Sequence, residues 1–482
     1  MHMAEHWKKA LRWLLFFIPL CLGTAGFYLQ GEMGMLDALF QGVCLYTLNY
    51  QDTPPNLLIE LARWTAPLAT AGGVLLAADR IRARLVRRLR YLRGDSVAVY
   101  GPEALRAELL ERLPQVGLRG IDAGEDWDLV RGERYLLLGS EEENFAFYSR
   151  NREALAGRMV YLQSATLPAQ SACGPHLRLF SPEETAARLF WREHCLYETS
   201  RAHCHQLKVV FLGFGVLGEK VLTYGLLNNI FDPGQRIEYH VFGDLSHFAA
   251  VHTGLSAVTD PVIPHPEPWY DALPLLEEAH RVIVLTQEGQ LALLRDLLLA
   301  VPERTFHVFD AGESGTELLA GRERLVVIPW EQMGRDPAHI FSDVMFRQAQ
   351  AINLRYARQY GGAEDTPRAL AEEWEKLDSF TRYSNISAAD YHQVRRMMLK
   401  VLGWRGEEAF SPQHLELLAE LEHIRWCRYH YLNNWRQGAP EGGGRKDPAR
   451  RLHTDLVPYE ALSEGEKQKD RDNIRLLLSM DE

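Results

Sequence analysis

The chain has 482 residues, of which 46% are hydrophobic, and it carries a formal net charge of -11. This length suggests about three domains beyond a short anchor, and the hydrophobic share is ample for packed cores. The acidic balance argues against nucleic acid as the main partner. The six cysteines show no paired CxxC spacing, which suits a reducing compartment.

Two apolar segments near the N-terminus have the length of membrane-crossing helices. Residues 11–29 would span roughly 28 Å as a helix, close to the thickness of a bilayer core. Residues 57–78 form a second segment, which is less uniformly apolar. The positive-inside rule then puts both ends of this helical hairpin, and everything after Arg80, on the cytoplasmic side of a bacterial inner membrane. A signal peptide is the alternative interpretation of the first segment.

A short apolar stretch and a hexapeptide lie between these segments. Residues 35–48 are too few to cross a bilayer and suit a re-entrant helix. The hexapeptide consists of Thr47, Leu48, Asn49, Tyr50, Gln51 and Asp52. It stands where a potassium channel carries Thr-Val-Gly-Tyr-Gly-Asp, and the order of parts resembles the two-helix potassium-channel pore unit.

The resemblance implies an ion pore in residues 1–79, with the hexapeptide as its filter. Because Asn49 and Gln51 occupy the two glycine places, a ring of backbone carbonyls would be strained. We therefore expect a wider, less selective pore lined by side chains. A membrane hairpin that conducts nothing is the alternative. The arginine-rich residues 80–94 would form a connector near anionic lipid headgroups.

From Ser96 onward, short β-rich runs alternate with amphipathic helices, which is typical of a mostly parallel α/β sheet. We expect strands at residues 96–100, 134–138 and 159–162, with helices at 103–113 and 142–155. The turn after the first strand, Gly101-Pro102-Glu103, has no glycine fingerprint, and its Glu would meet a bound phosphate. Residues 95–199 are therefore expected to form a Rossmann-like domain without a nucleotide site.

A second Rossmann-like unit, residues 205–345, carries a glycine fingerprint. The strand predicted at 207–212 runs directly into Gly213-Phe214-Gly215-Val216-Leu217-Gly218 and then a helix starting near Glu219. Gly213 would permit a tight turn, Gly215 the close approach of a pyrophosphate, and Gly218 close helix packing. Asp244 follows the next strand, 237–242, where a ribose-binding acid is expected. Further strands are expected at 281–285, 305–309 and 325–328.

This pattern predicts an adenine nucleotide or NAD-derived ligand, with a purely structural role for the glycines as the alternative. Two such units after a two-span pore resemble the tandem regulator-of-conductance (RCK, TrkA-N) domains of ligand-gated potassium channels. The resemblance implies a homotetrameric cytosolic ring whose rearrangement pulls on pore-lining helices.

The C-terminal region, residues 368–482, follows a helix and linker at 346–367 and is expected to be mainly helical. Its ordered features are Glu420-Leu421-Glu422-His423-Ile424-Arg425-Trp426, then Trp435, then His453-Thr454-Asp455-Leu456-Val457-Pro458-Tyr459. They are similar to the ryanodine-receptor repeat (RyR) domain. Asn434 stands where that family usually has Gly, and Gln437 where it usually has an aromatic residue.

The resemblance suggests a second nucleotide site in the RyR-like region. An adenine base needs an exposed aromatic face, because stacking is worth about 1 to 3 kcal/mol per base, and Trp435 is the first candidate. Trp426 is expected to be a core anchor, because it recurs at helical spacing with Leu418 and Leu421. The complete set of candidate ligand-binding residues here is Trp435, Arg436, Arg445, Lys446, His453 and Tyr459.

No catalytic or metal-binding motif is evident. The chain has no HExxH, no GxSxG and no P-loop, and no tyrosine is followed four positions later by lysine. We therefore expect no enzyme, but a channel-like membrane effector opened by a small nucleotide messenger, with lipid, ions and the nucleotide as partners. Such an effector would suit bacterial antiphage defence. A membrane-anchored NAD(H)-binding oxidoreductase or redox sensor, and a non-conducting scaffold, are the alternatives.

Overall fold

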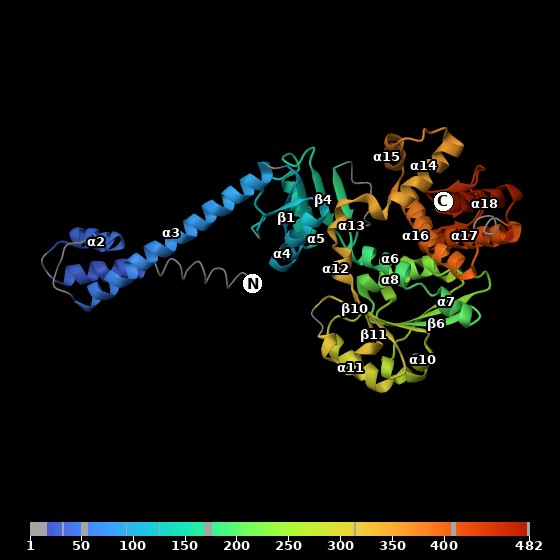
Figure 1. The fold of residues 1–482 in the computed structure, drawn as a ribbon, viewed down its shortest axis with the longest axis horizontal. Helices are drawn as coiled ribbons and strands as arrows, with labels where there is room; N and C mark the ends of the chain where they lie inside the picture. Colours follow the sequence, from blue (N-terminus) through green and yellow to red (C-terminus); the bar gives the residue numbers. More distant parts are fainter. Residues whose placement is uncertain are drawn as a thin grey trace. The chain divides into compact units, whose positions relative to one another are not determined.

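The computed structural model describes residues 17–30, 33–49, 56–92, 94–124, 126–167, 176–312, 315–405 and 411–479. The chain divides into two compact units, Met1–Gly94 and Asp95–Glu482 (Figure 1).

Helices make up the described part of the first unit. A helical segment covers residues 17–29, α2 covers Met35–Cys44, η1 covers Leu45–Thr47, and α3 covers Leu57–Leu92. Small residues let these helices approach closely, because a Cβ at Gly42 would lie only 2.7 Å from Thr24 Oγ1. Their shared core consists of Phe27, Ala38, Leu45, Ile59, Ala62 and Ala66.

Among the residues described, no helix is both long enough and apolar enough to cross a bilayer. Helix α3 is long, but Glu60, Arg63 and Pro67 interrupt its apolar first half. The predicted membrane pore unit and the predicted inner-membrane location are therefore wrong.

The described half of the expected filter is the end of a helix. Thr47 ends η1, and its hydroxyl donates to the Cys44 carbonyl at 3.1 Å. Leu48 has a positive φ of 58°, and the Asn49 N–H donates back to the Cys44 carbonyl at 3.1 Å. This is the geometry of a helix C-terminal cap, and it replaces the extended pore lining that we expected. The other filter residues lie outside the described residues: Tyr50, Gln51 and Asp52.

The second unit begins with a five-stranded parallel sheet, ordered β2-β1-β3-β4-β5. The interior strand β1 is buried at every position, as expected where helices cover both faces. The strand order reverses between β1 and β3, as in flavodoxin-like sheets. Its elements are β1 (Ser96–Tyr100), α4 (Glu103–Arg112), β2 (Arg119–Asp122), β3 (Arg134–Leu137), α5 (Glu141–Arg150), β4 (Met159–Gln163) and β5 (Leu177–Phe180).

A six-stranded parallel sheet follows, ordered β11-β10-β9-β6-β7-β8. Counted from β6, this is the 3-2-1-4-5-6 order of dinucleotide-binding folds. Helices α6 (Pro182–Glu193) and α7 (Tyr197–Ala202) lead into it. Its strands are β6 (Gln206–Leu212), β7 (Arg236–Phe242), β8 (Val262–Pro264), β9 (Arg281–Val284), β10 (Phe306–Asp310) and β11 (Leu325–Pro329). Its helices include α8 (Gly215–Asn228), α9 (Ser246–Val251), α10 (Leu273–Glu278) and α11 (Gln290–Ala300).

Several short helices connect the second sheet to the C-terminal region. After α12 (Trp330–Gly334), the chain forms α13 (Pro337–Phe341), a 3₁₀ turn at Asp343–Met345, and α14 (Arg347–Gly361). Asp336 starts α13 by accepting a bond from the Ala338 N–H. These short helices lead into the C-terminal region.

The C-terminal region is mainly helical, as predicted. It contains α15 (Pro367–Glu375), α16 (Ser379–Leu402), α17 (Pro412–Leu432) and α18 (Glu464–Ser479). Asp378 and Ser411 cap α16 and α17 through their side chains. A small sheet lies between α17 and α18 in the sequence, with strands β12 (Arg436–Gln437), β13 (Lys446–Asp447) and β14 (Leu452–His453) in the order β12-β14-β13.

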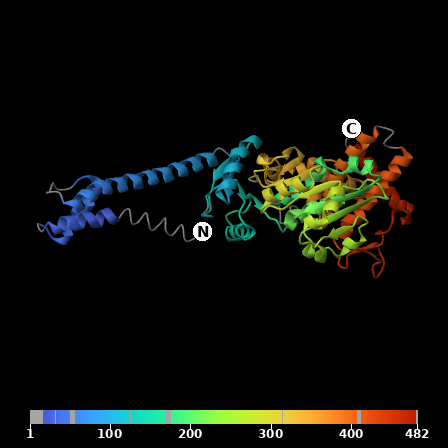
Figure 2. The same cartoon turned by 90° about the horizontal axis from the view of Figure 1, so that it is seen from below.

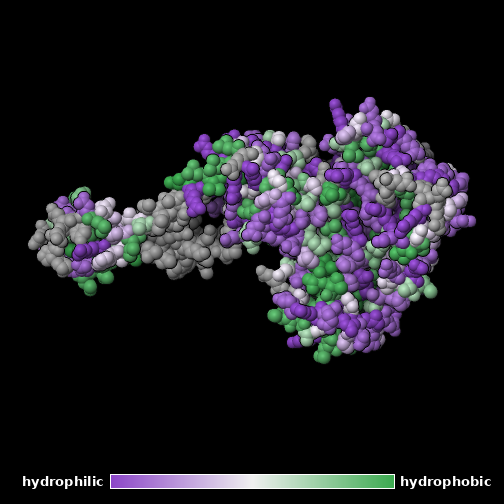
Figure 3. Space-filling model, in the orientation of Figure 1, coloured by the Kyte–Doolittle hydropathy of each residue, from purple (hydrophilic) through white to green (hydrophobic). Residues whose placement is uncertain are grey.

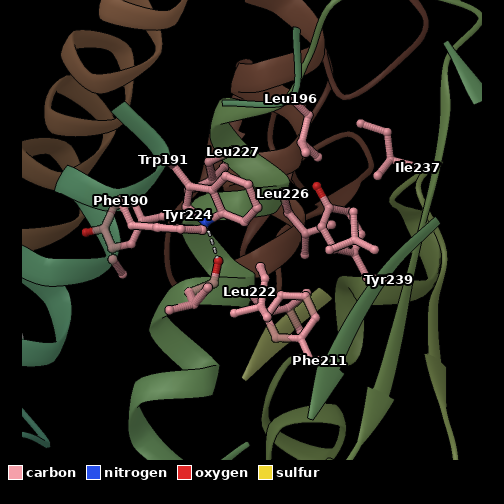
Figure 4. Close-up of a cluster of buried hydrophobic side chains, with 14 of the residues drawn as sticks. Phe190, Trp191, Leu196, Phe211, Leu222, Tyr224, Leu226, Leu227, Ile237 and Tyr239 are labelled. Carbon is pink, nitrogen blue, oxygen red and sulfur yellow. Dashed lines mark hydrogen bonds between the residues drawn. The ribbon is translucent and has the colours of Figure 1, made fainter. Parts of the chain in front are cut away.

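The second sheet and the C-terminal helices share one hydrophobic core. Phe211 of β6 and Tyr239 of β7 face the apolar side of α8, and the Trp191 indole donates to the Val221 carbonyl at 2.7 Å (Figure 4). Tyr391 of α16 belongs to the same cluster. Figures 1 and 2 show α16 and α17 on the face of the second sheet that α8 covers. The visible surface of this unit is mostly hydrophilic (Figure 3).

Candidate functional site

The turn between β6 and α8 lies where the strand order of the second sheet reverses. Strand β6 pairs with β7 on one side and with β9 on the other, and ligands of such sheets bind at the carboxyl ends of the strands at this point. Gly213 has a φ of +90°, and a Cβ there would lie 2.5 Å from Thr286 Oγ1 and 2.7 Å from the Thr286 nitrogen. Only glycine fits this turn.

The other two glycines of the fingerprint have different surroundings. A Cβ at Gly218 would lie 2.8 Å from the Phe214 ring, so Gly218 is required by packing. Gly215 begins α8 with a φ of +67°, and no atom lies within 4 Å of the position that its Cβ would take. Open space therefore adjoins Gly215, which is exposed together with the next residue, Val216.

The N-terminus of α8 is not capped by a side chain. The first backbone bond into the helix is donated by the Gly218 N–H to the Phe214 carbonyl at 3.2 Å, so the N–H groups before it lack a helical acceptor. A helix of 14 residues also places partial positive charge at this end. This end of α8 therefore suits a phosphate or pyrophosphate.

Asp244 lies at the same edge of the sheet. The Gly213 N–H donates to the Phe242 carbonyl at 2.9 Å, which fixes the glycine turn beside the end of β7. Asp244 follows two residues later and is exposed. Its Oδ1 accepts bonds from the Ser246 hydroxyl at 2.5 Å and the Ser246 N–H at 3.0 Å. These bonds lower the pKa of Asp244, so its carboxylate is charged at neutral pH.

The corresponding edge of the first sheet is filled by side chains. A Cβ at Gly139 would lie 2.5 Å from the Trp127 ring and 2.9 Å from Glu143 Oε2. Trp127 also stacks on Tyr100 at 5.6 Å between ring centroids. Glu143 and Ser140 form a capping box at the start of α5. This filling agrees with our expectation that the first sheet has no nucleotide site, which stays a prediction.

In the C-terminal region, Trp435 is more buried than we expected. Only 7% of it is exposed, its ring stacks on Phe380 at 5.2 Å, and it packs with Cys427 and Leu456. Trp426 is only partly buried. The tryptophan expected to offer a stacking face is thus a core residue, and the expected core anchor has the more accessible ring.

Three histidines surround Trp426, at ring-centroid distances of 5.7 Å for His423, 4.0 Å for His430 and 4.9 Å for His453. Burial lowers the pKa of His430 to about 3, and its Nδ1–H donates to the Trp426 carbonyl at 2.8 Å. Burial also lowers the pKa of His453, whose Nδ1 accepts from the Asp455 N–H. For His423, burial opposes the charged form, but the bond to the Asp470 carboxylate prevails and raises the pKa to about 10.

The small sheet gathers some of the predicted basic residues. Lys446 pairs with His453 across β13 and β14, and Arg436 lies on β12 beside them. Arg445 instead forms an ion pair with Glu466, so its charge is already compensated. Tyr459 lies in a separate buried cluster that includes Leu415, Leu418 and Ile474. The structure therefore brings Trp435, Arg436, Lys446 and His453 together. Arg445 lies beside this group, since its guanidinium is 3.8 Å from the Asp455 carboxylate, whereas Tyr459 lies apart.

Sequence reasoning missed the residues that join the two candidate sites. Asn434, noted only as a departure from the family pattern, has a φ of +61°, a conformation that Gly adopts freely and Asn tolerates. Its side-chain amide contacts Val251, the last residue of α9, and Thr253 and Gly254 after it. The family's preference for Gly at this position was the available signal that a left-handed corner was required.

A model of the RyR domain family matches residues 410–480. The predicted similarity to the RyR domain is confirmed for this part of the chain. The comparisons give no support to the pore, RCK or TrkA-N parts of the predicted resemblance. No curated protein and no solved structure shows a significant match to the chain.

Proposed function

We propose that the chain is a nucleotide sensor that binds an adenine dinucleotide at the carboxyl edge of its second sheet. The observation that carries the proposal is the open space beside Gly215, at the uncapped start of α8 and at the point of strand-order reversal. A pyrophosphate could approach the backbone there because Gly215 has no side chain. Adenine dinucleotides are the ligands that this combination fits best.

The Asp244 carboxylate favours binding of a ribose without a 2′-phosphate. A charged carboxylate after β7 can accept hydrogen bonds from both ribose hydroxyls, whereas it would repel a 2′-phosphate. Because hydrogen bonds from Ser246 lower the pKa of Asp244, the carboxylate stays charged at neutral pH. We therefore expect NAD+ to bind more tightly than NADP+.

The position of α8 supports a signalling role. Helix α8 begins at Gly215 and is packed between the sheet and helices α16 and α17 of the C-terminal region, in one continuous core. A ligand at the start of α8 would therefore act on a helix that the RyR-like region contacts directly. This retains the nucleotide-messenger part of the expected function, without the membrane pore.

The test is a calorimetric titration of the full chain with NAD+, comparing Gly215→Ala with Gly157→Ala. Both glycines have positive φ, +67° and +74°, and open space at the Cβ position, so each variant should lose roughly 1 to 2 kcal/mol of stability. Only Gly215→Ala should weaken NAD+ binding, by about tenfold or more, because its methyl group enters the pyrophosphate space. Equal affinities in both variants, or no NAD+ binding by the unmodified chain, would overturn the proposal.

A further inference from the structure

Helix α9 contacts both sides of the proposed dinucleotide site. At its start, Ser246 donates two hydrogen bonds to the Asp244 carboxylate. His247 contacts Glu219 of α8 at 3.2 Å. Phe248, which is 1% exposed, packs edge-on against Phe214 of the glycine turn at 5.8 Å between ring centroids. A ligand that moves either the glycine turn or Asp244 would therefore move α9.

The other end of α9 is tied to the end of α17. The Phe248 and His252 rings pack together, with their centroids 4.3 Å apart. The His252 Nδ1–H donates a hydrogen bond to the Leu432 carbonyl at 2.6 Å. The fit is close, because a Cβ at Gly254 would lie only 2.2 Å from the Tyr431 carbonyl oxygen. A displacement of residues 252–254 cannot be absorbed by empty space at this contact.

Asn434 forms the second tie between these segments. Its Nδ2 donates to the Val251 carbonyl at 2.7 Å, and its Oδ1 accepts from the Thr253 hydroxyl at 3.1 Å and the Gly254 N–H at 3.3 Å. One amide thus satisfies three groups at the end of α9. The backbone of Asn434 is the left-handed corner after α17.

The corner leads directly into the aromatic cluster of the RyR-like region. The Trp435 N–H donates to the His430 carbonyl at 2.9 Å, and the Trp435 ring stacks on Phe380. Strand β12 and the small sheet begin at the next residue, Arg436. Because α9 has only six residues, about 9 Å of helix, it is short enough to move as one body between the two regions.

We infer that α9 and the Asn434 corner transmit ligand binding at the glycine turn to residues 430–436 of the RyR-like region. This inference rests on the proposed dinucleotide site. Coupling between two sites is reciprocal at equilibrium, so a ligand of the RyR-like region would also change the affinity of the dinucleotide site. The C-terminal region would then report the occupancy of the second sheet.

The test is hydrogen exchange measured by mass spectrometry on the full chain, with and without saturating NAD+. In the unmodified chain, we expect NAD+ to slow exchange about twofold or more both at residues 213–218 and at 430–436. Asn434→Gly keeps the left-handed backbone, because Gly adopts it freely, but removes the three amide contacts. In this variant, slowing should persist at 213–218 and fall at 430–436, where only the His252 bond to the Leu432 carbonyl remains.

Tyr391→Phe is the matched control. It also removes a hydrogen bond between the C-terminal region and the second-sheet region, from the Tyr391 hydroxyl to the Ile230 carbonyl at 2.7 Å, but it leaves α9 and Asn434 intact. Both regions should respond to NAD+ in this variant. If Asn434→Gly does not fold, Thr253→Val removes one of the same contacts and should reduce the response at 430–436.

The outcomes separate the inference from the proposed function. Slowing at 213–218 without any change at 430–436 in the unmodified chain would overturn the inference and leave the dinucleotide site standing. A full response at 430–436 in Asn434→Gly would show that the corner is not the link. The absence of any response at 213–218 would overturn the proposed function, and the inference with it.

Discussion

His423 and His430 lie about two turns apart on α17, yet the fold holds them in opposite protonation states. The Asp470 carboxylate raises the pKa of His423 to about 10 despite its burial, whereas burial lowers the pKa of His430 to about 3. A raised folded pKa stabilises the fold below the unfolded pKa of about 6.5, and this stabilisation is lost as the pH rises toward 10. For His430 the sign is reversed, and stability is lost as the pH falls from about 6.5 toward 3.

We therefore predict a pH-dependent effect of His423→Gln. At pH 6 the variant should be at least about 2 kcal/mol less stable than the unmodified chain, because it lacks the charged pair with Asp470. The difference should shrink as the pH rises and vanish near pH 10. Urea denaturation at pH 6, 8 and 10 measures it. A difference that stays constant over this range would mean that His423 contributes only packing.

At the residue scale, the sequence predicted chemical types better than exposure. The left-handed turn at Gly213, the packing role of Gly218 and the charged acid after β7 could all be predicted from residue types and spacing, and the structure brings them to one edge. The burial of Trp435 could not, because the ring that covers it, Phe380, comes from α16, more than fifty positions earlier. Helical spacing alone gave Trp426 the core position instead.

At the element scale, α17 is held to the second sheet by a buried ion pair. Arg428 of α17 contacts Asp260, just before β8, at 2.7 Å, and the two side chains are 3% and 0% exposed. Asp260 also accepts bonds from the Gln235 side chain and the Ile237 N–H. Removing one partner of such a pair leaves an uncompensated buried charge, which costs about 3 to 5 kcal/mol.

Arg428→Met should therefore destabilise the second unit by about 3 kcal/mol or more. The double variant Arg428→Met/Asp260→Asn should recover much of this loss, because the remaining charge is removed. Arg475→Met on α18 is the control, since it breaks an exposed pair with Asp472 and should cost less than about 1 kcal/mol. Chemical denaturation measures the free energy of unfolding of all three variants. A double variant no more stable than Arg428→Met would show that the loss comes from packing and not from charge.

Central strands and their helices were predictable because the strands are apolar and mostly buried. The strand expected at 96–100 is β1, and that at 207–212 lies within β6 (Gln206–Leu212). Edge strands β2, β5 and β8 were missed, since they are only partly buried and carry too little apolar pattern. The apolar segments near the N-terminus were wrongly predicted to be membrane spans, for another reason. Apolar length alone does not separate a membrane span from helices that bury small residues against one another, as Gly23 and Gly42 allow.

At the scale of the whole molecule, the boundary expected at residue 368 does not divide the hydrophobic core. Side chains of α16 and α17 belong to the same cluster as β6, β7 and α8, and among them are Tyr391, Val394, Met398, Leu421 and Leu432. Sequence patterns identified the RyR-like region, but nothing in them indicated which of its faces would be covered by the second sheet. The contact depends on side chains some 200 positions apart in the chain.

This shared core predicts that the RyR-like region does not fold alone. A fragment of residues 368–482 would expose the apolar side chains that face α8 and would leave Arg428 without Asp260, so it should show no cooperative thermal transition. Residues 95–482 form one compact unit and should unfold in a cooperative transition. Circular dichroism melts of the two fragments measure this difference. A cooperative melt of 368–482 would show that the RyR-like region is stable on its own and that the shared core is not required for its folding.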